Sequence, residues 1–123
     1  MREMTAYLGG QELVLAATFK ASVEIADTVG DPLTIMREAA LESMFINAGI
    51  AYEPKWRFTI QNVVKVIAIG LKASGSKMIL VDLQDLVFSA GFVAAKEIAG
   101  DYLALIAGPQ PEEVSDKGSS EGN

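Results

Sequence analysis

The fold of this chain is decided by its most continuous apolar helical segment, TIQNVVKVIAIGLKAS, which spans residues 59–74. Thr59 can cap a helix there, because a threonine hydroxyl accepts a hydrogen bond from a backbone N–H group of the first turn. Apolar residues then recur at helical spacing and form a complete stripe of Ile60, Val63, Val64, Ile67, Ala68 and Leu71. We therefore expect a central helix that builds the core of the domain.

The same segment carries a second apolar line, formed by Val66, Ile69 and Ala73, on the side away from that stripe. A surface helix has one apolar face, so the second line needs a covering of its own. The N-terminal hairpin described below and the aromatic segment 52–58 could cover it within the chain. Alternatively Val66 and Ile69, with Phe88 further along the chain, form a protein interface. Ile69→Lys would then disrupt assembly and leave the chain folded, whereas unfolding would place Ile69 in the core.

Before this segment, the chain predicts a short β-hairpin. Residues 4–8 and 12–16 are β-prone runs. The intervening Gly9-Gly10-Gln11 predicts a three-residue loop, in which glycine can adopt a positive φ.

Two helices are expected between the hairpin and the central segment. Thr18 can cap the first, which ends at Gly30. Asp31 can cap the second, because its carboxylate accepts a hydrogen bond from a backbone N–H group of the first turn. Pro32 suits the first helical position because it has no N–H group to leave unpaired. Apolar residues fall at helical spacing in both: Phe19, Val23 and Ala26 in the first, and Leu33, Met36, Ala40 and Met44 in the second. We expect these stripes to pack into the core.

The second helix should close at Ala48-Gly49, and a segment of a different kind follows it. Residues 50–58 contain Pro54 and three aromatic residues, namely Tyr52, Trp56 and Phe58. We expect a loop or a short extended piece whose aromatic side chains seal the domain.

Two more helices are expected after the central segment. Asp82 with Asp85 resembles a weak capping box that opens a fourth helix. Its inward residues would be Leu83, Leu86, Val87 and Ala90, with Phe88 off that face. A fifth helix over residues 92–107, ended by Gly108-Pro109, would pack Phe92, Ala95, Ala99, Tyr102, Leu103 and Ile106.

The whole pattern predicts a mainly α fold. Residues 1–108 would form one domain, a short N-terminal β-hairpin followed by about five short helices in a compact bundle. Residues 109–123 contain four acidic residues against Lys117 and are rich in proline, serine and glycine. Because such a composition buries little apolar surface, we expect a disordered acidic tail there.

Composition excludes several classes of function. The 123 residues include no histidine and no cysteine, which removes the commonest general base, the commonest metal ligand and any thiolate chemistry. Ten basic against sixteen acidic residues give a net charge of −6, which disfavours nucleic acid and anionic lipid as partners. No apolar stretch is long enough for a membrane span, and Glu3 disfavours a signal peptide. We expect a cytoplasmic protein with no enzymatic activity, metal, cofactor or small-molecule substrate.

Three motifs that could carry chemistry have simpler interpretations. Residues 70–77 have the glycine spacing of a P-loop, but Ser76-Lys77 stands in the wrong order and a helix is ending there. The helices on either side of Gly91 could imitate a helix-turn-helix, but the second offers one cation, Lys96, in its first turns. Asp82 and Asp85 suit a helix N-terminus better than a pair of catalytic carboxylates.

The chain resembles the tail assembly proteins of gene transfer agents and related siphophages, described as tail assembly chaperones or tail tube proteins. The resemblance spans residues 9–113. It rests on residues 10–30, including Ala17-Thr18-Phe19-Lys20-Ala21 and Val23-Glu24-Ile25-Ala26-Asp27, on Asp31-Pro32-Leu33, on the helix from Phe58-Thr59-Ile60 to Gly70-Leu71-Lys72-Ala73, and on Ala90-Gly91-Phe92 and Tyr102-Leu103.

This resemblance implies a phage or prophage tail assembly chaperone in the cytoplasm of the bacterial host. Such a protein binds the tape measure protein and the tail tube protein, associates with its own copies, and performs no catalysis. A structural tail tube component is the alternative, although a short hairpin is a poor source for the large sheet of a tube ring. A small protein-interaction domain unrelated to phage is a third possibility.

Overall fold

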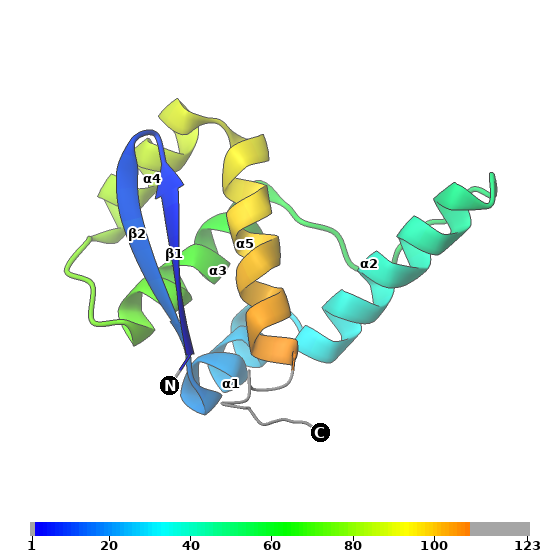
Figure 1. Cartoon of the computed structure of the whole chain (residues 1–123), viewed down its shortest axis with the longest axis horizontal. Helices are drawn as coiled ribbons and strands as arrows, with labels where there is room; N and C mark the ends of the chain where they lie inside the picture. Colours follow the sequence, from blue (N-terminus) through cyan, green and yellow to red (C-terminus); the bar gives the residue numbers. More distant parts are fainter. Residues whose placement is uncertain (1, 109–123) are drawn as a thin grey trace, which may run out of the picture.

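The computed structural model describes residues 2–108, which form one hairpin followed by five helices. In chain order these are β1 (Arg2–Leu8), β2 (Gln11–Ala17), α1 (Phe19–Thr28), α2 (Pro32–Asn47), α3 (Ile60–Ala73), α4 (Leu80–Ala90) and α5 (Phe92–Ala107) (Figure 1). The predicted mainly α fold with an N-terminal hairpin is therefore confirmed. The predicted acidic tail, residues 109–123, lies outside the described residues.

The hairpin has a tighter turn than expected. Gly9 and Gly10 both have positive φ angles, 58° and 81°, and Leu8 pairs directly with Gln11. The loop therefore contains two residues instead of three, because two consecutive glycines can adopt the left-handed conformation that a type I′ turn requires. The strand β2 contributes most of the buried face, through Leu13, Leu15, Ala16 and Ala17.

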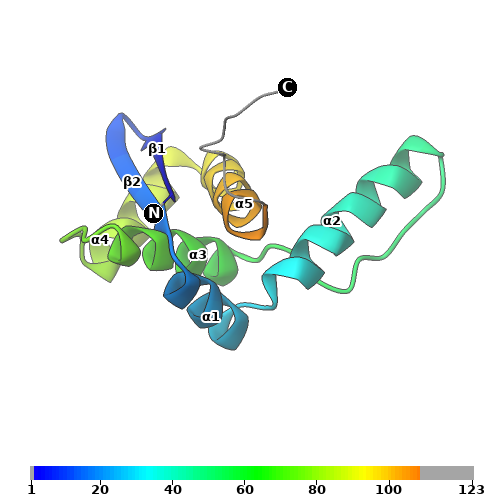
Figure 2. The ribbon, with the colours of Figure 1, turned by 60° about the horizontal axis from the view of Figure 1, so that its bottom comes forward.

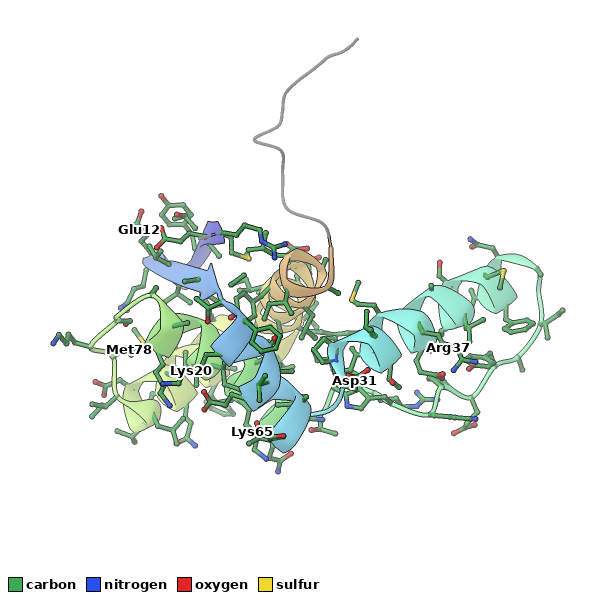
Figure 3. The ribbon with its side chains drawn as sticks, turned by 90° about the horizontal axis from the view of Figure 1, so that it is seen from below. Glu12, Lys20, Asp31, Arg37, Lys65 and Met78 are labelled. Carbon is green, nitrogen blue, oxygen red and sulfur yellow. The ribbon has the colours of Figure 1, made fainter. Side chains whose placement is uncertain are left out.

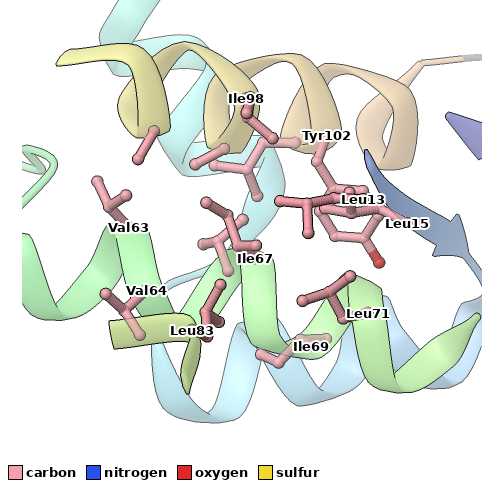
Figure 4. Packing of buried hydrophobic residues seen from close by; sticks show 14 of the residues in the cluster. Leu13, Leu15, Val63, Val64, Ile67, Ile69, Leu71, Leu83, Ile98 and Tyr102 are labelled. Carbon is pink, nitrogen blue, oxygen red and sulfur yellow. The ribbon is translucent and has the colours of Figure 1, made fainter. Parts of the chain in front are cut away.

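Helix α3 lies at the centre of the molecule, as its sequence predicts. The Thr59 hydroxyl accepts a hydrogen bond from the Asn62 backbone N–H at 3.1 Å and so caps the helix. Its sides pack against β2, α5, α1 and α4, and Figure 4 shows Ile67 among the buried side chains of the core. The predicted stripe is buried with two exceptions, since Ile60 is 53% exposed at the first turn and Ala68 is half-buried.

The second apolar line of α3 also lies in the core, which corrects the prediction that Val66 and Ile69 form an interface. Val66 is 0% exposed and Ile69 only 6%. Ile69 and Ala21 of α1 line the same small hollow, so α1 covers this side of α3. Neither side chain is available to a partner in the folded chain.

Helix α1 buries a different face from the expected one. Thr18 caps it as predicted, accepting the Ala21 N–H at 3.0 Å. However, Ala21 and Ile25 are the buried residues, whereas Phe19 is 83% exposed and Val23 also faces solvent. The small Ala21 side chain allows close approach to α3, which the bulky Phe19 would prevent.

Helices α4 and α5 pack largely as predicted. Leu83 and Val87 are buried, Leu86 and Ala90 are half-buried, and the buried face of α5 includes the predicted Ala95, Ala99, Tyr102 and Leu103. The capping box is wrong, because α4 begins at Leu80 with Ile79 in the cap position and no side-chain capping bond. Asp82 therefore lies within the first turn, where its charge still suits the helix N-terminus.

Three long-range hydrogen bonds attach the hairpin to α5 and its C-cap residue. The Tyr102 hydroxyl donates to the Ala16 carbonyl oxygen at 2.6 Å inside the core, and burial raises the pKa of Tyr102 to about 12. Arg2 donates to the carbonyl oxygens of Leu105 and Gly108 at 2.7 and 2.9 Å. Its positive charge therefore lies at the negative end of the α5 dipole.

Helix α2 extends away from the rest of the molecule (Figures 1 and 2). It contacts α5 and α1 near its base, and the chain that follows it returns alongside before α3 begins. We call α2 together with residues 48–58 the arm. Most of α2 therefore has no contact with the other helices.

Candidate interaction surfaces

A buried carboxylate holds the arm together. Glu38 of α2 is 1% exposed, and its Oε1 accepts hydrogen bonds from the Tyr52 hydroxyl and from the Lys55 backbone N–H, both at 2.8 Å. The Arg37 guanidinium lies 3.4 Å from its Oε2. The Lys55 N–H and then the Tyr52 hydroxyl are the main causes that lower the pKa of Glu38. Glu38 thus fastens the returning segment to α2 as a charged acceptor.

Aromatic contacts secure the same segment at both ends. Tyr52 stacks on Phe45 of α2 with ring centroids 5.1 Å apart. Trp56 and Phe58 meet edge to face at 4.9 Å, and the Trp56 Nε1–H donates to the Val29 carbonyl oxygen at 3.2 Å. Trp56 and Phe58 pack against the core, as predicted for the aromatic segment, whereas Tyr52 seals the arm instead.

The Glu38 contacts predict a specific acid sensitivity. The pKa of Glu38 is lower in the folded chain than its ordinary value of 4.5, so its stabilising contribution is present above pH 4.5 and is lost as pH falls through the folded pKa. We expect Glu38→Gln to lower the melting temperature at pH 7 and to reduce the further loss seen below pH 4.5. Thermal unfolding followed by circular dichroism between pH 7 and 3 measures both.

The control for this prediction is Glu97→Gln, which removes an exposed carboxylate from α5. It should leave the melting temperature and its pH dependence close to those of the wild type. Parallel acid profiles for Glu38→Gln and the wild type would contradict the role assigned to Glu38.

One face of the arm is an open apolar stripe. It comprises Leu33, Met36, Ala40 and Met44, which we call the arm stripe. We expected these residues in the core, but Leu33 is 69% and Met44 56% exposed, Ala40 is also exposed, and only Met36 packs against the core. The buried residues of α2 are Pro32, Ile35 and Glu38. Figure 3 shows Asp31 at the base of the arm and Arg37 further along it.

A hollow of about 350 Å³ lies where the arm leaves the body. Its apolar lining comes from α1, the start of α2 and the end of α5, with Phe19, Val23, Ala26, Leu33 and Ile106 as the main residues. We call it the base hollow. Leu33 belongs both to this hollow and to the arm stripe, so the two form one continuous apolar surface.

The second apolar surface lies on α4. Leu80, Val81 and Phe88 are all more than half exposed, with Phe88 at 74%. Val81 and Phe88 are seven residues apart and therefore share one helix face; we call these three residues the α4 surface. Phe88 also contacts Phe92 edge to face, with centroids 6.0 Å apart. Of the three predicted interface residues, Phe88 alone lies on the surface, and its contact with a partner stays a prediction.

Two further hollows are more polar. The larger of these two, about 690 Å³, lies between β2, the end of α3 and the start of α4, and its ionisable residues are Glu12 and Asp82. Another, about 470 Å³, separates the inner side of α2 from residues 56–58 and carries Glu42, Arg57 and Lys96 at its wall. Among residues 2–108, no three acidic side chains gather closely enough to hold a metal ion.

The P-loop-like residues 70–77 and the helix after Gly91 both have a structural role in the fold. Ser74 ends α3, and Gly75 follows with a φ of +87°, which is the left-handed conformation common after a helix. The helix after Gly91 turns Ala95, Ile98 and Ala99 into the core. Residues 70–77 are therefore a helix end, and α5 packs internally.

Comparison with known protein families, curated proteins and solved structures found no match. In the described part of the chain, no helix combines the length and the apolar character that crossing a membrane requires. The apolar surfaces on the arm and on α4 are the candidate interaction sites of the described chain.

Sequence reasoning missed most of these surface residues, although it had identified several of them as apolar. Periodicity predicts a core position for Phe19, Leu33 and Met44, because it shows that a face is apolar without showing what covers it. A usable signal was present in α2, where Ile35 and Ile46 lie on a different face from Leu33. Two apolar faces on one helix indicate that two different partners are needed.

Proposed function

We propose that this protein is a tail assembly chaperone of a phage or prophage, which binds the tape measure protein and associates with its own copies. The observation that carries the proposal is the presence of two separate apolar surfaces, the arm stripe with its base hollow and the α4 surface. Sizeable exposed apolar patches mark interaction sites in soluble proteins. The proposal assigns no catalysis, and it places the protein in the bacterial host cytoplasm, where tails assemble.

The α4 surface suits an elongated helical partner such as a tape measure protein. Val81 and Phe88 present apolar side chains two helical turns apart, and Gln84 and Asp85 lie between them. Helices recognise one another through apolar residues at this spacing. We assign the α4 surface to the tape measure protein and the arm to self-association, while the tail tube protein is the expected second partner.

A structural tube component is the alternative function. The residues 2–108 contain one sheet of two strands, whereas a tube ring requires larger sheets from each subunit. The fold therefore favours the chaperone over the tube component. Tubes formed spontaneously by the purified protein would reverse this preference.

The tape measure interaction can be tested with Phe88→Ser. We expect the wild-type chain to bind a purified helical segment of the tape measure protein from the same gene cluster. The variant should bind at least tenfold more weakly, because an exposed aromatic anchor often supplies ~2 kcal/mol or more at an interface. Biolayer interferometry gives both Kd values.

The matched control is Ile60→Ser, which removes a half-exposed apolar side chain from the start of α3. It should bind the tape measure segment as the wild type does. Equal loss in both variants would indicate general stickiness, and a wild-type chain that does not bind at all would favour an interaction domain unrelated to phage.

A further inference from the structure

The arm stripe has a symmetric pattern. Met36 and Met44 lie four residues before and after Ala40, while Leu33 and Asn47 lie seven residues before and after it. Positions four and seven residues from Ala40 fall on the same helix face as Ala40 itself. This face of α2 therefore has its smallest side chain at the centre and larger side chains at matching distances on both sides, and all of them are exposed except the half-buried Met36.

We propose that the arms of two copies pair antiparallel around a twofold axis at Ala40. A twofold interface uses the same patch on both copies and must complement itself. Antiparallel pairing places Met36 against the partner's Met44 and Ala40 against the partner's Ala40. The small alanine on the axis lets the helices approach to about 8 Å, the short end of the usual interaxial range. This inference rests on the self-association in the proposed function and gives it a surface.

The tip of each arm would fill the base hollow of the other copy. Leu33 would lie opposite the partner's Asn47, so the partner's chain just beyond α2 would lie over the hollow. Ile50, at this tip, is 53% exposed. An aliphatic side chain suits the apolar wall of Phe19, Val23 and Ile106. Both ends of the arm stripe are thereby covered by one symmetric contact.

Charge is compatible with the same arrangement. Arg37 is the charged residue closest to the stripe, and its side chain is 67% exposed. The last turn of α2 contains no basic residue. Antiparallel pairing places Arg37 beside the partner's Ser43 and last turn, where the helix dipole favours a positive charge. The two Arg37 side chains lie about 9 Å apart along the paired helices, and the Glu38 carboxylate 3.4 Å from each guanidinium offsets part of its charge.

The size of the contact indicates a reversible dimer. A helix of 16 residues is about 24 Å long, so one helix pair makes a small contact compared with stable interfaces, which bury about 1,200–2,000 Å². The oligomeric state should therefore depend on concentration. Light scattering across a dilution series is the appropriate measurement.

The decisive variant is Ala40→Arg. We expect it to raise the dimer dissociation constant by about 100-fold or more, because two arginine charges would face each other on the axis. Its control is Ala39→Arg, an exposed alanine one residue away that faces the hollow on the inner side of α2. This control should dimerise as the wild type does, and circular dichroism should show both variants folded.

Cysteine cross-linking tests the orientation, since the chain has no cysteine of its own. Ala40→Cys should form a disulfide-linked dimer under mild oxidation. An equimolar mixture of Met36→Cys and Met44→Cys should form the mixed disulfide. Neither variant should cross-link alone, because equal positions lie about 12 Å apart along antiparallel helices. Cross-linking of Met36→Cys alone would indicate parallel pairing and overturn the proposal.

The outcomes separate this inference from the proposed function. A dimer that resists Ala40→Arg overturns arm pairing and leaves self-association through another surface. A wild-type chain that stays monomeric at every soluble concentration overturns arm pairing and self-association together. The tape measure binding assay is independent of both results, because Phe88 lies on α4 and not on the arm.

Discussion

The variant Val66→Lys is expected to be unfolded, or nearly so, at room temperature. Val66 is completely buried on α3 and belongs to the apolar core. An unpaired buried charge costs about 3–5 kcal/mol, a large share of the ~5–15 kcal/mol that stabilises a typical domain. Urea denaturation and the near-ultraviolet circular dichroism of Trp56 measure the loss.

Ile69→Lys is the comparison for this variant. Ile69 lies beside a hollow that also contains Lys20, Glu24 and Lys72, and Glu24 already lies 3.5 Å from Lys72. A lysine at position 69 can extend its ammonium group through this hollow toward water. We expect a smaller loss of stability than for Val66→Lys. Normal folding of Val66→Lys would show that Val66 is not in the core and would restore it as an interface residue.

The variant Gly70→Ala is expected to lose about 1–3 kcal/mol of stability, the usual cost of an overpacked core. A Cβ atom at Gly70 would lie 2.7 Å from Leu15 Cδ2 and 2.9 Å from Leu15 Cβ. The second of these atoms is next to the backbone of β2 and cannot turn aside. Urea denaturation of both proteins, with equal slopes, gives the difference directly.

The same substitution at Gly100 is expected to raise the stability of the fold instead of lowering it. Gly100 also lies inside a helix, α5, but a Cβ atom there meets nothing within 4 Å. Gly100→Ala should therefore raise stability by up to about 1 kcal/mol, through helix propensity alone. If both variants gained stability, the close approach of α3 and β2 would be contradicted.

Local signals explain why the helix positions could be predicted. Thr18, Asp31 and Thr59 each accept a hydrogen bond from a backbone N–H three residues ahead, and this interaction is encoded within four consecutive residues. The prediction for Asp82 was wrong because the helix begins three residues earlier than a cap at Asp82 requires, with Leu80 as its first residue and Ile79 in the cap position. Nothing in the local pattern distinguishes a cap from a first-turn acid.

The faces of the helices could not be assigned in the same way. Both faces of α1 are apolar in sequence, and only contact with α3 decides that Ile25 is buried and Phe19 exposed. The environment of Glu38 depends on Tyr52 and Lys55, which are 14 and 17 residues away along the chain. A charged residue within α2 predicts solvent exposure by default, so its burial required the folded structure.

Glu38 has a consequence for the entropy of binding. A projecting helix followed by a loose return loop would lose conformational freedom when a partner ordered it, and this loss would weaken the complex. The hydrogen bonds from Tyr52 and Lys55 order the return segment already in the isolated chain. The arm is therefore preorganised, and a small interface can retain more of its contact energy as affinity.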